Sequence, residues 1–174
     1  MSSLTERPTK EEYGGHFGTY IDIVPEGNIV DILADDLKAT SEFLSDLPLE
    51  KAEHRYAPGK WSIKEVIGHI ADTERIMSYR LLRIARGDNT PLPGFDQDEY
   101  MKYVDFDAYT LSDLIENYIS VRKATLSLVR GLTDEAWART GTASNTVMSA
   151  KALAYVVAGH GLHHIRIVKD KYLA

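Results

Sequence analysis

The sequence predicts an all-α protein built as a four-helix bundle. Three observations lead to this prediction: four long segments carry apolar residues at helical spacing, two of them open with a capping box, and no segment has a convincing strand pattern. With 174 residues, of which 44% are hydrophobic and 26% charged, the chain is most economically one domain. We expect that domain to span residues 1–174, with residues 1–27 as an N-terminal extension packed on the bundle.

The first two helices follow from periodicity and from their start and stop signals. One is predicted from Asn28 to Leu47, and Pro48 ends it. The next opens with Ser62, which forms a capping box with Glu65, and runs to about Ala85, where Gly87 is a natural stop.

A long connection, from Asp88 to Tyr109, separates the second helix from the third. It contains two prolines and a glycine, and a short helix over Asp96–Tyr103 is plausible within it. The third helix is predicted from the N-cap Thr110, with Asp113 completing its box, to Gly131. The fourth runs from Ser149 to about Tyr172.

Composition excludes several classes of function. A net charge of −6 argues against nucleic acid as the main partner, and no apolar run is long enough to span a bilayer. The N-terminus lacks the apolar core of a signal peptide, so a cytoplasmic location is expected. Cysteine is absent, so any metal must be held by imidazole or oxygen, and any thiol chemistry needs a thiol from outside the chain.

Two histidines of the fourth helix are predicted to face the core. His160 and His164 are four residues apart and lie on the apolar stripe, whereas His163 is about 100° further around the helix. Two neighbouring imidazoles in an apolar setting repel when protonated and are poorly solvated when neutral. A bound metal ion resolves both problems, although a hydrogen-bonded packing role is the alternative for each ring alone.

A third ligand could come from His69 on the second helix. Its position alone predicts a partly exposed residue at the edge of the apolar stripe. The ligand hypothesis for His69 is supported only because the pair on the fourth helix needs a third ligand from a neighbouring helix. Three histidines with open positions are typical of a catalytic metal site. The H-E-x-x-H motif and the Glu-x-x-His pairs of di-iron bundles are both missing, which favours a single ion.

Two charged residues fall within apolar stripes. Glu74 lies in the stripe of the second helix and Arg122 in that of the third, so we predict that they pair inside the bundle. A structural ion pair that fixes helix register is favoured over a catalytic role.

Other polar residues are candidates for the walls of a pocket. The segment from Leu92 to Tyr100 is either a solvated connector or a flap over the site, and residues Gly15–Tyr20 could pack over one end of the bundle. The pocket candidates are Asp72, Thr73, Asp96 and Tyr100.

Several short motifs together resemble the DinB-like superfamily of metal-binding four-helix bundles, from about Tyr20 onward. The motifs are Lys60–His69, Asp72–Arg75, Ala85–Asp88, Pro93–Asp96, Ala158–His160 and His163–His164. The resemblance implies that His69, His160 and His164 bind one divalent metal ion, most often nickel or zinc. It also implies a small-molecule substrate and gives a weak preference for a homodimer.

Three functions remain open. The first is a metal-dependent transferase or isomerase that uses a low-molecular-weight thiol as cosubstrate, with Arg80, Arg86 or Arg166 near an anionic cosubstrate. For each of these arginines, however, a solvated surface position is the favoured reading. The second is a hydrolase acting through metal-bound water with Asp72 or Asp96 as base. The third is a non-catalytic metal-binding module.

Overall fold

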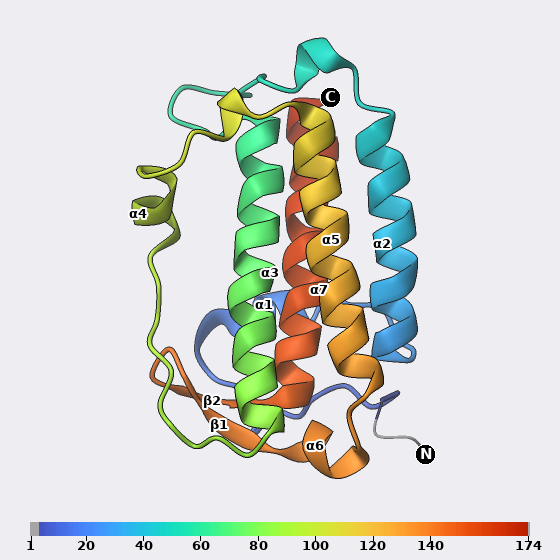
Figure 1. Cartoon of the computed structure of the whole chain (residues 1–174), viewed down its shortest axis with the longest axis vertical. Helices are drawn as coiled ribbons and strands as arrows, with labels where there is room; N and C mark the ends of the chain where they lie inside the picture. The colour runs from blue at the N-terminus through green and yellow to red at the C-terminus, as the bar shows by residue number, and fades with distance from the viewer. Residues whose placement is uncertain (1–3, 174) are drawn as a thin grey trace.

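The computed structural model describes residues 4–173 and consists mainly of four long helices standing side by side (Figure 1). The predicted all-α four-helix bundle is confirmed. A π-helical turn, Val168–Tyr172, continues the last helix. The long helices are α2 (Ile29–Ser45), α3 (Ile63–Ala85), α5 (Leu111–Arg130) and α7 (Ala150–Ile167).

The helices begin where their capping residues stand. The Ser62 hydroxyl accepts a hydrogen bond from the Glu65 amide, and the Glu65 carboxylate accepts one from the Ser62 amide, so the predicted box at α3 is present. Thr110 and Asp113 form the same arrangement at α5. These side chains satisfy amides that the first helical turn leaves without an intrahelical acceptor.

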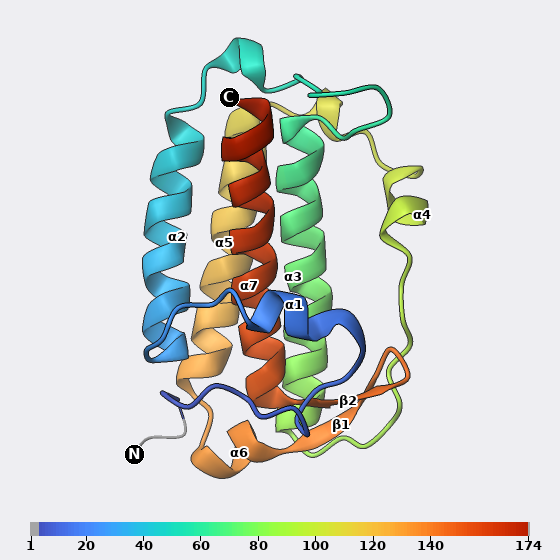
Figure 2. The same ribbon diagram turned by 180° about the vertical axis from the view of Figure 1, so that it is seen from behind.

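Helices α3 and α5 are neighbours that run in the same direction, while α2 and α7 run the opposite way (Figures 1 and 2). Asp107, which lies just before α5, connects the N-terminal ends of α3 and α5. Ser62 Oγ donates a hydrogen bond to its carboxylate over 2.6 Å, and Lys64 Nζ donates one to its carbonyl over 2.9 Å. The chain must therefore travel the whole length of the bundle between α3 and α5, which explains the long connection.

The connection runs outside α3 and contains the short helix α4 (Gln97–Met101) (Figure 1). Near its start, the Leu92 amide donates a hydrogen bond to the Thr142 carbonyl over 2.9 Å. The Leu92 carbonyl accepts a hydrogen bond from the Ser144 amide over 3.1 Å. The connection is thereby fixed to the segment that follows α5.

That segment contains a β-hairpin, so the expectation of no strands is wrong. After α6 (Asp134–Ala138), strands β1 (Thr140–Ala143) and β2 (Thr146–Ser149) pair antiparallel at the lower end of the bundle (Figure 1). Ser144 and Asn145 form the turn with φ of 52° and 60°. Strands of four residues leave little alternation to detect, and this turn lacks the glycine that usually marks a type I′ hairpin.

The N-terminal segment crosses the side of α7 near its middle, not an end of the bundle as predicted (Figure 2). It contains α1 (Gly18–Ile21), and residues 1–3 of the predicted extension lie outside the described residues. Gly159 permits the crossing, because a Cβ there would collide with the backbone of Tyr20. Tyr20 is thus placed directly over the part of α7 that carries the histidines.

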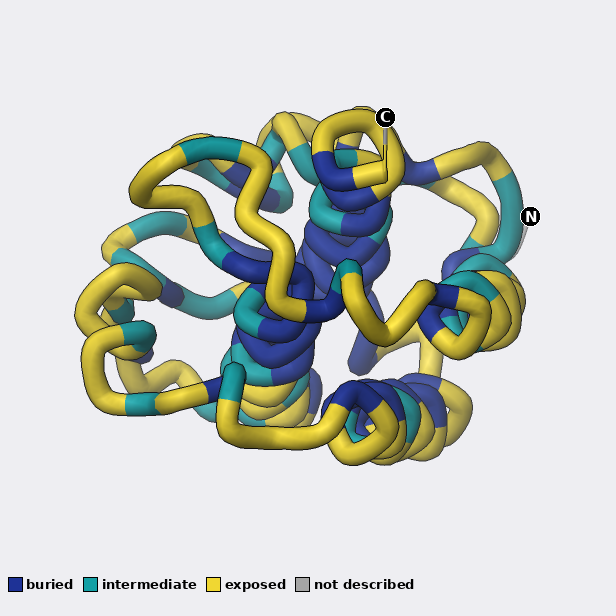
Figure 3. The backbone as a smooth tube through the Cα atoms, turned by 90° about the horizontal axis from the view of Figure 1, so that it is seen from above, coloured by how far each residue is buried: buried dark blue, intermediate teal, exposed yellow. Residues whose placement is uncertain are grey.

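Buried positions face the interior between the helices, and α7 is buried around most of its first three turns (Figure 3). Helix α7 contacts α3, α2 and the N-terminal segment that contains α1. Within the described chain, no helix combines the length and the apolar character needed to cross a membrane.

Candidate metal centre

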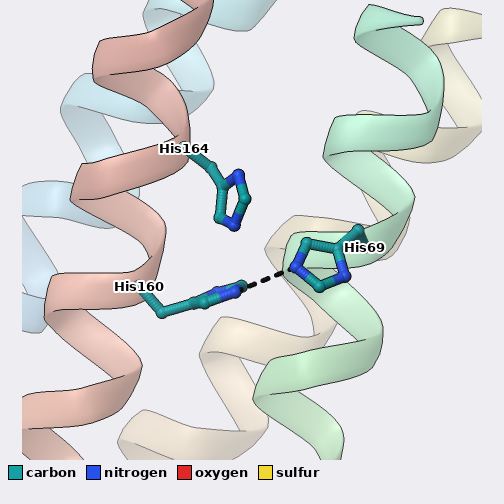
Figure 4. Close-up of side chains that lie close together, drawn as sticks. All are labelled: His69, His160 and His164. Atoms are coloured by element: carbon teal, nitrogen blue, oxygen red, sulfur yellow. Dashed lines mark hydrogen bonds between the residues drawn. The ribbon is translucent and has the colours of Figure 1, made fainter. Parts of the chain in front are cut away.

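Three histidine side chains converge between α3 and α7 (Figure 4). His69 projects from α3, and His160 and His164 project from successive turns of α7, so one face of each helix supplies the group. The ring centroids are 4.8 Å apart for His69 and His160, 4.8 Å for His69 and His164, and 4.5 Å for His160 and His164. The structure therefore brings together the three residues that the sequence proposes as ligands.

The three rings are held in their neutral form. His69 and His160 are 4% and 5% exposed, so the alternative of a partly exposed His69 at a helix edge is wrong. Burial lowers the pKa of His69 to about 4 and that of His164 to about 3. Burial, reinforced by the other histidines, also holds the pKa of His160 well below its usual value. Neutral imidazole is the form that binds metal ions.

The spacing of the donor atoms suits one ion. The Nε2 atoms of His69 and His160 are 3.0 Å apart, and one nitrogen from each of the three rings lies within 4.8 Å of the others. Nitrogen ligands at about 2.0–2.1 Å from a tetrahedral ion are about 3.4 Å apart. The observed separations, from 3.0 Å to at most 4.8 Å, span this value.

His163 does not take part in this group. Its ring packs edge-on against Tyr20 at 5.6 Å and against His164 at 5.1 Å. Tyr20 also contacts His160 edge-on at 5.3 Å, and burial raises the pKa of its hydroxyl. An uncharged tyrosine therefore covers His160 on the side of the N-terminal segment.

A cavity of about 490 Å³ ends at His160. Its walls come from the N-terminal segment, from α3 and from the long connection. Residues that represent these three walls are Tyr20, Thr73, Arg80, Phe95 and Asp96. A smaller cavity, of about 240 Å³, reaches His164 and is lined in part by Trp61 and Tyr172. Two separate cavities thus adjoin the histidine group, one at His160 and one at His164.

Of the four pocket candidates, Thr73 and Asp96 line the larger cavity, whereas Asp72 and Tyr100 do not. Thr73 is buried, lines the larger cavity and has no hydrogen-bond partner for its hydroxyl. Asp96 also lines it, but its carboxylate accepts the amides of Asp98 and Glu99 at the start of α4. Tyr100 is 49% exposed and packs on Phe95. Asp72 forms an ion pair with Arg75 and does not line the cavity.

Arg80 is buried, which corrects its reading as a solvated surface residue. Its side chain is 2% exposed and lines the larger cavity. The covering segment is the long connection, whose Pro93 carbonyl accepts a hydrogen bond from Arg80 Nη2 over 2.7 Å. Arg86 and Arg166 are exposed, as expected for surface arginines.

The predicted pair of Glu74 and Arg122 forms, and it has a third member. Arg122 Nε lies 2.8 and 3.0 Å from the carboxylate oxygens of Glu74, and Arg122 Nη1 lies 2.7 Å from Asp36 Oδ2. Asp36 also receives hydrogen bonds from Thr40 and Tyr118. We call Asp36, Glu74, Arg122, Thr40 and Tyr118 the arginine cluster.

Sequence reasoning missed Asp36 and Tyr20. Asp36 could have been found, because it follows Leu33 by three residues and shares its buried face of α2, as Glu74 shares one on α3. Tyr20 carried no comparable signal. Its place beside His160 depends on how the N-terminal segment crosses α7.

Comparisons with known proteins agree with this architecture. Two proteins of Oceanobacillus iheyensis, each named a “putative metal-dependent hydrolase”, are 27% identical over 130 residues and 29% identical over 125 residues. The first match covers 74% of this chain and 74% of the relative, and the second covers 69% and 70%.

Two solved structures share the fold. One is YfiT from Bacillus subtilis, described as a probable metal-dependent hydrolase with an unusual four-helix bundle topology, with a TM-score of 0.71 at 17% identity over 82% of each chain. The other is a mycothiol-dependent maleylpyruvate isomerase, with a TM-score of 0.65 at 15% identity over 79% of this chain and 58% of that one. A family model described as the DinB superfamily matches residues 32–168. The chain belongs to the DinB superfamily.

Proposed function

We propose that this protein is a metal-dependent enzyme that uses a low-molecular-weight thiol as cosubstrate. The observation that carries the proposal is the group of three neutral histidines, two buried and one half-buried, at the end of a cavity. His69, His160 and His164 would hold one divalent ion, with zinc and nickel both suited to a set of three imidazoles. Because none of the three ligands is charged, the ion keeps its full double charge toward whatever occupies its open positions.

A thiol suits this site because the three histidines would hold an ion that lowers the pKa of a thiol, whose proton would leave to solvent. No separate proton acceptor is then required beside the histidines. Among the described residues, no carboxylate is hydrogen-bonded to the three rings, and Glu74 is occupied by Arg122. The chain has no cysteine, so the thiol must enter from solution.

Hydrolysis is the second candidate, and it is favoured by Asp96 and by the names of the two Oceanobacillus relatives. Asp96 lies in the wall of the same cavity as His160. A carboxylate in that position could accept a proton from water that takes the place of the thiol. Both of its amide contacts at α4 are made by Oδ1, so Oδ2 is the atom that could take the proton.

The metal site is tested by measuring bound metal after reloading with zinc, nickel or cobalt(II). We expect wild type and His163→Ala to bind one equivalent, and His69→Ala and His160→Ala to lose at least about tenfold in affinity. His163→Ala is the matched control because its ring contacts His164 without joining the group. Equal metal content in wild type and His160→Ala would refute the site.

The thiol is tested on the cobalt(II)-loaded protein with mercaptoethanol. A thiolate on the ion gives an intense sulfur-to-cobalt absorption band, and conjugation of the thiol to a chlorinated dinitrobenzene measures transfer. Both signals should disappear in His160→Ala. Turnover of ester substrates without any thiol, lost in Asp96→Asn, would support hydrolysis and contradict the thiol proposal.

A further inference from the structure

The larger cavity contains a buried arginine that has no carboxylate partner. Arg80 is 2% exposed, and its recorded acceptors are the Pro93 carbonyl and, at 3.5 Å, the sulfur of Met77. It forms no ion pair with any carboxylate of the described residues. A buried guanidinium is normally paired, because an uncompensated buried charge is costly. By contrast, Arg122 on the neighbouring helix has two carboxylates.

Thr73 provides a second unsatisfied group in the same wall. Its hydroxyl is buried without a hydrogen-bond partner, although a threonine within a helix commonly bonds to the carbonyl four residues earlier. His69, Thr73, Met77 and Arg80 follow one another along one face of α3. The unsatisfied hydroxyl therefore lies between the histidine group and the unpaired guanidinium.

The opposite walls combine aromatic and apolar side chains with the polar residues His16, Asp96, Gln97 and Ser144. Phe95 lies 5.6 Å from the Arg80 guanidinium, measured to the ring centroid, and Phe17 and Val156 also line the space. Among the described lining residues, Arg80 is the only arginine or lysine. Asp96 is the carboxylate of this lining, but it accepts two amides at the start of α4 and does not pair with Arg80. The unpaired guanidinium beside these apolar side chains suits a ligand with one negative charge and a hydrocarbon body.

We propose that the larger cavity binds a small organic carboxylate whose charged end pairs with Arg80, whose middle meets the Thr73 hydroxyl and whose other end reaches the histidine group. The planar guanidinium matches a carboxylate with two parallel hydrogen bonds. The part of this proposal that concerns the reacting end rests on the proposed function, whereas the pairing with Arg80 does not.

The helix sets the length of such a ligand. Residues 69 and 80 are about 16 Å apart along the α3 axis, at about 1.5 Å per residue. The Arg80 side chain points back toward His69, as its contact with Met77 shows, and this shortens the gap to about 10 Å. A straight chain of about eight carbon atoms spans that gap, which makes octanoate a suitable probe.

The test measures octanoate and octanol binding to the metal-free protein by titration calorimetry. We expect octanoate to bind about 10- to 100-fold more tightly than octanol, the range of a charged hydrogen-bonded pair. Arg80→Met should remove that preference. Arg86→Met, which removes the same charge from the exposed end of α3, should keep it. Equal affinity for octanoate and octanol in wild type would overturn the inference.

A second arginine variant covers the case in which Arg80→Met does not fold. Arg80→Lys keeps the charge but loses the planar pair of donors, and it should weaken octanoate binding by about tenfold. Thr73→Val is the matched control in the same wall: octanoate presents only its hydrocarbon chain to this position, so the variant should keep octanoate binding. Unchanged octanoate affinity in Arg80→Lys would also overturn the inference.

The same titration on the cobalt(II)-loaded protein separates this inference from the proposed function. Octanoate should bind the loaded and metal-free proteins with similar affinity, without replacing a cobalt ligand. If octanoate binds only the loaded protein and changes the cobalt spectrum, its carboxylate lies on the ion and the role of Arg80 is refuted, while the metal site stands. If cobalt does not bind but octanoate binds more tightly than octanol and loses this preference in Arg80→Met, the metal site is refuted while the pairing with Arg80 stands.

Discussion

Two groups of polar side chains are buried in the same bundle, and they differ in how far their hydrogen-bonding capacity is used. In the arginine cluster, charges of both signs meet, and Glu74, Asp36, Thr40 and Tyr118 all have partners. In the histidine group, three neutral rings share one hydrogen bond. The arginine cluster is satisfied from within except at Arg122 Nη2, which has no acceptor, whereas the histidine group keeps its remaining ring nitrogens available. Burial alone therefore does not distinguish a structural polar group from a binding site.

The largest expected effect is the loss of Arg122. Arg122→Met leaves Asp36 and Glu74 as buried carboxylates without a cation, so the free energy of unfolding should fall by about 3–5 kcal/mol. Urea unfolding followed by circular dichroism measures it. Arg130→Met, an exposed arginine on the same helix, is the control and should change little. A loss below about 1 kcal/mol would mean that the arginine cluster does not stabilise the fold as argued.

Mild acid should destabilise the metal-free protein through the histidine group. In the folded protein the pKa values of His69 and His164 lie below the ordinary value of 6.5. Below pH 6.5 the unfolded chain therefore binds more protons than the folded chain, and protonation favours unfolding. Stability is therefore intact above pH 6.5 and falls below it. With His160 included, the first pH unit should cost about 3 kcal/mol, at about 1 kcal/mol for each ring.

The matched variants for this pH dependence are His160→Ala and His54→Ala. His160→Ala should flatten the decline by about a quarter to a third, because it removes one of four histidines whose pKa is lowered, and the less buried His163 contributes least. His54 is exposed, and its replacement should leave the decline as in wild type. A decline of the same steepness in all three proteins would assign it to other groups.

Metal binding should stabilise the protein only where the histidine group is complete. At a free zinc concentration one hundred times the dissociation constant, the gain is about 2.7 kcal/mol. Thermal or urea unfolding with and without zinc measures it in wild type, His160→Ala and His163→Ala. The gain should vanish in the first variant and persist in the second. A gain in all three would place the ion elsewhere.

The smallest effect compares one threonine from each region. Thr40 donates a hydrogen bond to Asp36 Oδ1 over 3.1 Å within the arginine cluster, so Thr40→Val should cost about 1 kcal/mol. Thr73 has no partner for its hydroxyl, so Thr73→Val should be neutral or stabilising, within about 1 kcal/mol. Urea unfolding of the two variants side by side decides. A greater loss at Thr73 would show that its hydroxyl has a structural role.

The helices were predictable from sequence because their signals are local. Apolar spacing and the two capping boxes placed α3 and α5 within a residue or two, and charges inside apolar stripes predicted the contact of Glu74 with Arg122. The core-facing positions of His160 and His164 followed from the same helix geometry, whereas His69 was proposed because the pair needs a third ligand and because of the family resemblance. Whether they bind metal stays a prediction, to be settled by the metal analysis.

The parts that sequence did not predict depend on contacts between distant segments. The parallel direction of α3 and α5 rests on Asp107, and the crossing of α7 by the N-terminal segment rests on Gly159. The burial of Arg80 depends on where the long connection lies. None of these leaves a periodic pattern, so helix-by-helix reasoning placed Arg80 at the surface.

The long connection between α3 and α5 has a consequence for how such a protein can diversify. It supplies Phe95 and Asp96 to the cavity but none of the three histidines, which all come from the bundle. Doubling the length of a flexible loop costs only about 0.6 kcal/mol in closure entropy. Insertions or exchanges in residues 88–109 can therefore reshape what enters the cavity while the histidines keep their geometry. The part of recognition that the connection encodes can therefore change independently of the histidines, whereas Arg80 and Thr73 share α3 with His69 and are tied to the bundle.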